Sequence, residues 1–361
     1  MSNNCSLWYF RSSVVQQPGV SILLTLYVIV GLGSILGNCA ILYSIYSRKD
    51  LKTSTNVFIA NLALADLFVT GTSLWLTPLY SVQQIWTYGE VMCKLWSGMT
   101  TVALLVSSFT LMSLAIFRYF FIVHSFCRHP GKALYLVVTG VWVISILLAL
   151  PLIFQTRLVV INSCPLKHSY CIDSWYPYEG RIWYGGSILF FKSILPFTVI
   201  ASCHCRIFVR LRHQYERLRQ ARSAAVAVRV FQRRQRMQRI LLAMVLIYAI
   251  CSLPLDVINT IKDIDWYLRS TILIVNTIKL PLTLVCHLLA MTALLWNPLL
   301  YAFFNSNFRR EMQSSVLELQ LQASTQLRQV RSALADYGSR RSSPLTPPNG
   351  DGLVERGHSH V

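Results

Sequence analysis

The chain has few charged residues, and few of those are acidic. Only 13% of its 361 residues are Asp, Glu, Lys or Arg, whereas a soluble globular domain has about 25%. A disordered chain is also excluded, because such chains have few aromatic residues and 12% of this chain is aromatic. With 54% hydrophobic residues, the composition predicts one body that is dissolved in lipid.

Motifs of enzyme chemistry are also missing. The sequence has no glycine-rich phosphate loop, no histidine pair at metal-ligand spacing in its apolar part, and no Ser-His-Asp set outside the apolar stretches. His358 and His360 lie close together near the end of the chain, where solvated polar residues are the simpler interpretation. We therefore expect neither enzymatic activity nor a protein-bound metal. No internal repeat is evident, which weakens an interpretation as a transporter with duplicated halves.

Seven long apolar stretches are present, each able to cross a bilayer core of about 30 Å, which takes roughly 20 helical residues. They lie near 20–46, 56–80, 92–123, 134–154, 184–211, 237–261 and 271–303. Strands of a membrane β-barrel would be about 10 residues long and alternating. We therefore predict an all-α membrane protein. It consists of an extracellular segment (1–19), a seven-transmembrane helix bundle (20–303), a short amphipathic eighth helix (304–318) and a disordered cytoplasmic tail (319–361).

Positive charge is concentrated in one connection. Of the 33 basic residues, eleven arginines lie between Arg206 and Arg239, where Glu216 is the only acid. Basic connections remain on the cytosolic side of a membrane, so the amino terminus is expected outside. The net charge of +19 then indicates attraction to anionic membrane lipid and no binding of nucleic acid.

Four of the ten cysteines fall outside in this topology, where disulfides persist. They are Cys5, Cys93, Cys164 and Cys171. The other six lie in spans or on the cytosolic side and are interpreted as small hydrophobic residues. Asn4 begins a formal N-glycosylation sequence in the outer segment.

Polar and helix-breaking residues recur inside the spans, where polar groups are costly and are functional candidates. They are Gly37-Asn38, Asn61 with Asp66, Arg118-Tyr119, Trp142, Pro196, Pro254, and Asn297-Pro298 with Tyr301. In this order they resemble the rhodopsin-like class of G-protein-coupled receptors, over roughly residues 20–315. Four further stretches are similar to the neuropeptide Y and neuropeptide F receptor group: 171–175, 253–259, 286–291 and 305–308.

The resemblance implies a multi-pass receptor of the plasma membrane that binds a C-terminally amidated neuropeptide and activates heterotrimeric G proteins. Arrestin and receptor kinases are further expected partners, with Ser342, Ser343 and Thr346 as candidate phosphorylation sites. The alternatives are a receptor for another amidated peptide and a diverged receptor that binds without signalling. A transporter or channel is less favoured, and an amine receptor would need an acid where Thr100 stands.

The resemblance also implies roles for residues of the bundle. Cys93 and Cys171 are expected to form a disulfide, while Cys5 and Cys164 are either a second pair or two thiols. G-protein coupling and switching are assigned to Arg118, Tyr119, Asn297, Pro298, Tyr301 and Pro254. Phe117 stands where the class has an acid before the arginine, so one resting-state restraint on Arg118 is missing.

Asp66, Ser107 and Asn297 are expected to converge in the bundle, as in the sodium pocket of the class. Ala293 and Leu294 stand where the class has more polar groups. The occupant is therefore either an allosteric sodium ion, the one cofactor considered, or a cluster of waters.

The ligand pocket is expected near the outer ends of the spans. Asp263 is the candidate partner for an arginine of the peptide, because a carboxylate accepts a guanidinium in a charge-assisted pair. Asn259 and His287 are candidates for the amidated terminus, and Thr100 lines the same pocket. Asp265 is a rival for the role of Asp263, and the remaining alternative is that both acids only balance Lys262 and Arg269 on a wet loop.

Lys192 and Asp256 are two unexpected charges within the spans. We predict that they form an ion pair at the pocket floor, because a pair offsets much of the cost of a buried charge. The pair would take up space left by Ser252, which stands where the class has tryptophan. Each could instead contact the ligand directly.

Overall fold

The structure, a computed structural model, describes residues 18–47, 53–124, 131–163, 166–177, 179–220, 225–268, 273–304, 320–322 and 324–332. The chain divides into two units, Met1–Arg309 and Arg310–Val361, which are described separately. Several predicted features lie outside the described residues. They are Asn4, Cys5, Cys164, Arg269, positions 305–318 of the predicted eighth helix, and the phosphorylation candidates Ser342, Ser343 and Thr346.

The first unit is built from helices, and their order follows the predicted spans. They are α2 (Pro18–Ser47), α3 (Ser54–Val69), α4 (Trp75–Gln83), α5 (Gly89–Val123), α6 (Gly131–Gln155), α7 (Glu179–Leu189), α8 (Leu195–Gln220), α9 (Ala225–Leu268) and α10 (Leu273–Phe304). Two short π-helical segments, η2 (Thr70–Leu74) and η3 (Phe190–Ile194), join α3 to α4 and α7 to α8. The described residues contain seven segments long and apolar enough to cross a membrane, at 19–47, 54–83, 89–123, 132–155, 179–217, 238–265 and 281–302. The predicted seven-span architecture is confirmed.

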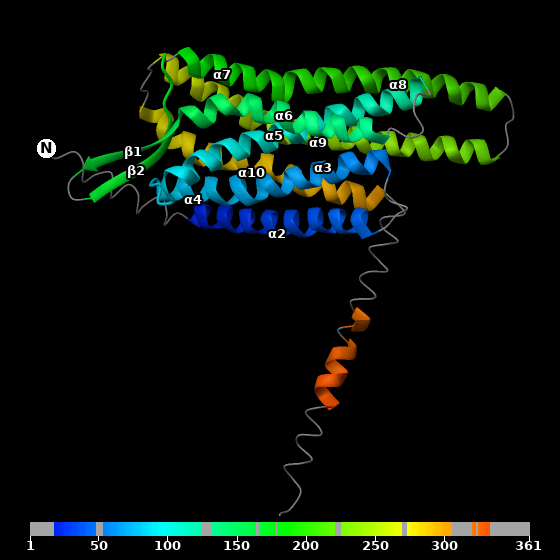
Figure 1. Cartoon of the computed structure of the whole chain (residues 1–361), viewed down its shortest axis with the longest axis horizontal. Coiled ribbons are helices and arrows are strands. Elements are labelled where there is room, and N and C mark those ends of the chain that lie inside the picture. Colours follow the sequence, from blue (N-terminus) through cyan, green and yellow to red (C-terminus); the bar gives the residue numbers. More distant parts are fainter. Residues whose placement is uncertain are drawn as a thin grey trace, which may run out of the picture. The chain divides into compact units, whose positions relative to one another are not determined.

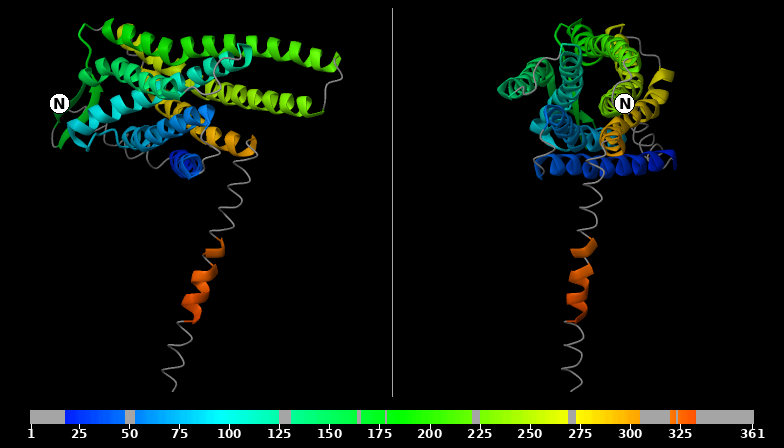
Figure 2. Two further views of the ribbon diagram at one scale, coloured as in Figure 1. Left: turned by 45° about the vertical axis from the view of Figure 1, so that its right-hand side comes forward. Right: turned by 90° about the vertical axis from the view of Figure 1, so that its right-hand side faces the viewer.

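The spanning helices run along one another, and α5 lies centrally against α3, α6 and α8 (Figure 1). Figure 2 shows α2 lying obliquely across one side of the bundle, where it contacts α3 and α10. Gly37 permits this approach, because a Cβ atom there would come within 2.7 Å of the Pro298 ring. Several apolar side chains of α6 instead point outward, with Ile144 52% and Leu147 58% exposed. Such an apolar outer surface is what contact with lipid requires.

Polar contacts also connect the helices inside the bundle. Asn61 of α3 donates to the Thr110 hydroxyl of α5 at 2.7 Å, and the Trp142 indole of α6 donates to Asn61 Oδ1 at 2.9 Å. Because no water competes at this depth, these bonds fix the three helices in register.

One end of the bundle carries a β-hairpin, β1 (Thr156–Ser163) and β2 (Leu166–Asp173), which are antiparallel with Leu158 opposite Cys171. We call this end the hairpin end (Figure 1). The predicted Cys93–Cys171 disulfide is present, with the two Cα atoms 5.6 Å apart, and it ties β2 to the first turn of α5. The hairpin itself was not predicted. Its sequence signal is the β-branched and apolar character of β1, with Val159, Val160 and Ile161 in a row, a run too short to count as a membrane span.

In the second unit, residues 320–322 and 324–332 are helical. The sequence analysis expected disorder from residue 319 onward, and these two short stretches differ from that expectation. The reason is local composition: this stretch is rich in Gln, Leu and Arg, which are good helix formers. The first glycine and the first proline of the tail come only at Gly338 and Pro344.

Candidate functional site

Lys192 and Asp256 are joined as predicted. The Lys192 ammonium donates to Asp256 Oδ1, and Ser193 Oγ donates to Oδ2 at 2.7 Å. Both charged residues are buried, with 9% of Lys192 and 4% of Asp256 exposed. The pair therefore connects the span of η3 and α8 to α9 in the interior of the bundle.

The π-helical segment η3 explains how two consecutive residues reach one carboxylate. In an α-helix, neighbouring side chains point about 100° apart. Within the wider turn of η3, both Lys192 and Ser193 reach the Asp256 carboxylate. Pro196, which has no amide hydrogen to donate, lies two residues after the end of η3. Ser108 of α5 donates to the Lys192 carbonyl oxygen, so a third helix supports the segment.

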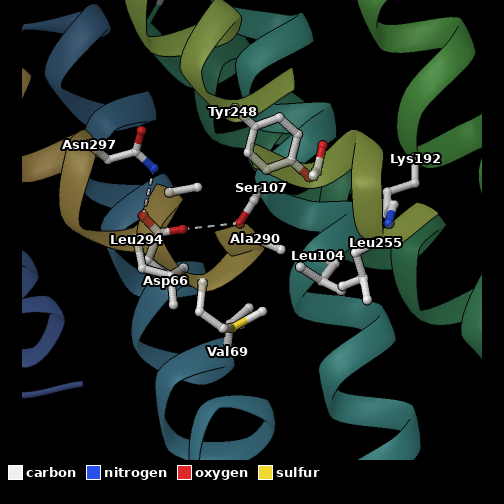
Figure 3. A pocket seen from close by; sticks show the side chains of 13 residues that line it. Asp66, Val69, Leu104, Ser107, Lys192, Tyr248, Leu255, Ala290, Leu294 and Asn297 are labelled. Atoms are coloured by element: carbon white, nitrogen blue, oxygen red, sulfur yellow. Dashed lines mark hydrogen bonds between the residues drawn. The ribbon is translucent and has the colours of Figure 1, made fainter. Parts of the chain in front are cut away.

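Asp66 lies at the centre of a second polar group. Its Oδ2 accepts from Asn297 Nδ2 at 2.8 Å and its Oδ1 accepts from Ser107 Oγ at 3.4 Å. All three residues are buried, and Asp66 is only 2% exposed. The predicted convergence of α3, α5 and α10 at this point is therefore present (Figure 3).

One small cavity extends from this carboxylate to the charge pair. Its volume is about 30 Å³, and its lining includes Asp66, Ser107, Asn297, Tyr248, Ser252 and Lys192. Figure 3 shows Lys192 and Asp66 on opposite sides, with Tyr248 between them. This is room for about two waters, so no peptide enters here. Ser252 stands where the class has tryptophan. Lys192 and Ser252 both line this cavity, as expected if the charge pair takes up space that a tryptophan would fill.

The donors around Asp66 are a poor set for a metal ion. Asp66 and Ser107 offer side-chain oxygens, but Asn297 turns its nitrogen to the carboxylate and Ala293 and Leu294 line the cavity without any side-chain oxygen. Within the described ranges, no group of three or more His, Cys, Asp or Glu residues is placed to hold a metal. A sodium ion at this point would take most of its ligands from water.

His287 is engaged on both ring nitrogens. Nδ1 lies 2.9 Å from the Tyr27 hydroxyl and Nε2 lies 2.9 Å from Ser73 Oγ. Tyr27 also donates to the Leu284 carbonyl at 2.9 Å, so Nδ1 carries the proton and Nε2 accepts from Ser73. His287 is 5% exposed, and a ligand reaches it only by replacing one of these partners.

The other two pocket candidates differ in their surroundings. Asn259 is exposed on α9 near the hairpin end. Thr100 is half-buried and donates to the Thr72 hydroxyl of η2 at 3.3 Å. Both residues lie on helices that border the space expected for a ligand. Among the hydrogen bonds of the described residues, none joins Asn259 or Thr100 to Asp263.

Asp263, the candidate partner for a ligand arginine, is bound to an arginine of the chain itself. Arg181 Nε donates to Asp263 Oδ1 at 3.0 Å, and Arg181 Nη1 lies 3.3 Å from Asp173 Oδ1. The expected alternative partners were Lys262 and Arg269. Arg181 was missed because nothing in the sequence links the start of the fifth span to the end of the sixth.

At the end opposite the hairpin, Phe117 precedes Arg118, where the receptor class that the sequence resembles has an acid. Phe117 packs against Phe58 and Phe121, with ring centroids 5.9 and 6.4 Å apart. In the described part of the chain, Arg118 Nε is buried and has no hydrogen-bond partner. Tyr119 is held by Arg206 of α8, which donates to its hydroxyl at 3.4 Å and covers its ring at 5.9 Å.

The end of α10 is packed into the bundle. Tyr301 is 2% exposed and belongs to a cluster with Ile41, Ile45, Ile59 and Ala63. Pro254 and Pro298 lie within α9 and α10, respectively. Proline removes a helical hydrogen bond and permits bending, so the residues expected to switch lie at deformable points of two neighbouring helices.

Comparison with known proteins gives one consistent result. The family described as 7 transmembrane receptor (rhodopsin family) matches residues 37–301. Neuropeptide Y receptor type 6 of Oryctolagus cuniculus is 28% identical over 323 residues, which is 86% of this chain and 84% of that protein. Neuropeptide Y receptor type 2 of Mus musculus is 32% identical over 81% of this chain and 76% of its own length. The Neuropeptide F receptor of Drosophila melanogaster is 26% identical over 84% and 64%.

Proposed function

Because the chain belongs to the rhodopsin family of seven-transmembrane receptors and, within it, to the neuropeptide Y receptor group, we propose that its ligand is a C-terminally amidated neuropeptide. The chain is a G-protein-coupled, multi-pass receptor of the plasma membrane and not an enzyme. The names of its relatives support a peptide of the neuropeptide Y or neuropeptide F type. A different amidated peptide is the nearest alternative.

The observation that carries this proposal is the guanidinium bound at Asp263. A carboxylate at the mouth of a helix bundle, 21% exposed and already paired with an arginine side chain, has the chemistry needed for an arginine of a ligand. Asn259, exposed one helical turn away on α9, has an amide suited to a peptide backbone. Thr100 lacks the charge that a small amine would require.

The proposed orientation has the hairpin end outside the cell. The disulfide at that end suits an oxidising environment. The arginines of α8, including Arg206, Arg210, Arg212 and Arg217, lie toward the other end, as the positive-inside rule requires. These arginines are then available for anionic lipid as well as for a cytosolic partner.

In this orientation, the G protein contacts the end that carries Arg118 and Tyr119. Arg118 has five N–H donors and lacks a neighbouring acid, so it is suited to peptide carbonyls of an inserted partner. Pro254, Asn297, Pro298 and Tyr301 are the proposed switch residues of α9 and α10. Arrestin and receptor kinases are proposed to act on the tail.

The proposed occupant of the cavity at Asp66 is water. Asp66 and Ser107 are among the polar residues that line it, and about 30 Å³ is enough for about two molecules. The residues around it fit a sodium ion poorly, so no step of the mechanism is assigned to sodium.

A screen of amidated peptides on cells that express the full chain tests the function. Second messengers are measured in both directions, and nucleotide exchange is measured on membranes from the same cells. We expect at least one peptide with an arginine near an amidated aromatic terminus to stimulate exchange, and the Arg118→Ala variant to bind the same peptide without stimulation. Surface-expressed receptor that binds no amidated peptide would contradict the proposal. Peptide binding without exchange in the wild-type chain would identify a binding-only receptor.

A further inference from the structure

At the hairpin end, one arginine is shared between two acids. Arg181 lies on α7, Asp263 near the end of α9, and Asp173 at the end of β2. The Nε–Oδ1 distance to Asp263 is 3.0 Å and the Nη1–Oδ1 distance to Asp173 is 3.3 Å. The arginine therefore joins three elements that are distant in the sequence, and it satisfies the same carboxylate that is proposed to receive the ligand.

This cluster is open to exchange. The side chains of Arg181, Asp173 and Asp263 are 23%, 28% and 21% exposed, so an incoming group reaches them without unfolding the bundle. Ion pairs that retain contact with water contribute little net stability. Replacing one guanidinium by another therefore costs little free energy at this site, whereas the Lys192–Asp256 pair is buried.

Asp173 is positioned to hold Arg181 after Asp263 is lost. Its Oδ2 accepts from the Trp175 indole at 2.8 Å. Trp175 is 9% exposed and stacks on Tyr184 with ring centroids 4.9 Å apart. Asp173 is thus anchored independently of Asp263, and an arginine that leaves Asp263 still keeps one carboxylate.

Asp263 itself is fitted against α7. A Cβ atom on Gly185 would overlap Asp263 Oδ2, so only glycine at this position leaves room for the carboxylate. The recorded hydrogen bond of the carboxylate is on Oδ1. A guanidinium that arrives from the ligand therefore competes with Arg181 for one defined group.

We propose that Arg181 is a tethered competitor, which occupies Asp263 until the guanidinium of a bound peptide replaces it. This inference rests on the proposed function. A ligand with an arginine restores at Asp263 the pair that Arg181 gives up, while Arg181 remains on Asp173. A ligand without a cation does not compete for Asp263, so Arg181 lowers the affinity of arginine peptides only. The exchange also releases the hairpin end of α9 from α7.

The competition predicts effects of opposite sign from two variants of one cluster. The probes are a peptide that ends in arginine and an amidated aromatic residue, and its twin with citrulline in place of the arginine. Arg181→Gln removes the competitor, so affinity for the arginine peptide rises about fivefold, the scale of an ion pair that retains contact with water. The affinity for the citrulline peptide is unaffected. Asp173→Asn removes the second carboxylate that binds Arg181. Arg181 then has only Asp263 as its acidic partner in this cluster, so affinity for the arginine peptide falls.

Two controls separate this mechanism from a general effect of charge. Lys262→Gln removes one positive charge next to Asp263 and is expected to shift affinity less than Arg181→Gln does. In the background of Asp263→Asn, Arg181→Gln is expected to have no further effect. Surface receptor is quantified in every case by antibody binding to an amino-terminal epitope.

If Arg181→Gln and Asp173→Asn both lower affinity, Arg181 is a structural clamp and the proposal is overturned. Equal gains from Arg181→Gln for the arginine and citrulline peptides would also overturn it. These outcomes leave the peptide receptor function intact, whereas a wild-type chain that binds neither peptide nor any other amidated peptide would reject both.

Discussion

Replacing Asp256 by Asn is expected to destabilise the bundle strongly, because it leaves the buried Lys192 ammonium without its anion. Lys192 and Asp256 are 9% and 4% exposed. Loss of one member of such a pair costs about 3–5 kcal/mol, against a total stability of about 5–15 kcal/mol for a typical domain. Lys192→Met is expected to have a similar effect, since Asp256 then keeps only Ser193 as a side-chain donor among the recorded contacts.

The double variant Lys192→Met/Asp256→Leu is expected to recover most of that loss. It removes both charges at once, and apolar replacement of a complete buried pair is often neutral or even stabilising by about 1–4 kcal/mol. Exchange of the two charges, Lys192→Asp with Asp256→Lys, should also recover surface expression, although Ser193 then faces an ammonium.

The assay is thermal unfolding of the solubilised full chain, with surface level in cells as a second measurement. A loss of about 3–5 kcal/mol corresponds to a decrease in Tm of roughly 4–7 °C, at about 2.1 cal/mol/K of unfolding entropy per residue over the 361-residue chain. The matched control is Lys94→Met, because Lys94 and Glu90 form a pair at 2.9 Å with side chains 39% and 57% exposed. Water already solvates that pair, so its loss should shift Tm very little.

Two results would refute this reasoning. Single variants at Lys192 or Asp256 that behave like the Lys94 control would show that the interior charges do not depend on each other. An apolar double variant as unstable as the single ones would show that the positions require polarity for another reason, such as direct contact with the ligand.

Three further predictions concern the other polar sites. Arg118→Ala should abolish most peptide-stimulated nucleotide exchange while peptide affinity changes little, and unchanged exchange would remove Arg118 from the coupling site. Asp263→Ala should reduce the potency of an arginine peptide by well over tenfold, since a lost desolvated charge partner costs about 2–5 kcal/mol; an equal loss for the citrulline twin would contradict the assignment. Agonist affinity should be the same in sodium, lithium and potassium salts, because Asp66 has few oxygen partners; a decrease specific to sodium, absent in Asp66→Asn, would instead identify a sodium site.

The length and polarity of the apolar stretches were sufficient to predict the bundle. A membrane leaves few architectures to such a chain, because every backbone polar group must be satisfied within it. The same property makes intramembrane charge informative. Lys192 and Asp256 were recognised as partners since neither is tolerated alone at that depth, and the structure joins them. The Cys93–Cys171 bond followed in the same way from a short list of cysteines outside the membrane and a family pattern.

Other features depend on the rotation and spacing of helices, which no local pattern records. That Arg181 meets Asp263 is decided by how α7 packs on α9, with Gly185 between them. Both nitrogens of His287 are engaged because α2 and η2 meet at α10. The π-helical turn of η3 is a change of one residue in helical register, too small to alter hydrophobic periodicity, yet it brings Ser193 to Asp256 beside Lys192. The sequence by itself determined which charges must be paired or exposed, because solvation depends on composition and depth; only the tertiary structure decided their partners, because contact depends on distances of a few ångströms between separate helices.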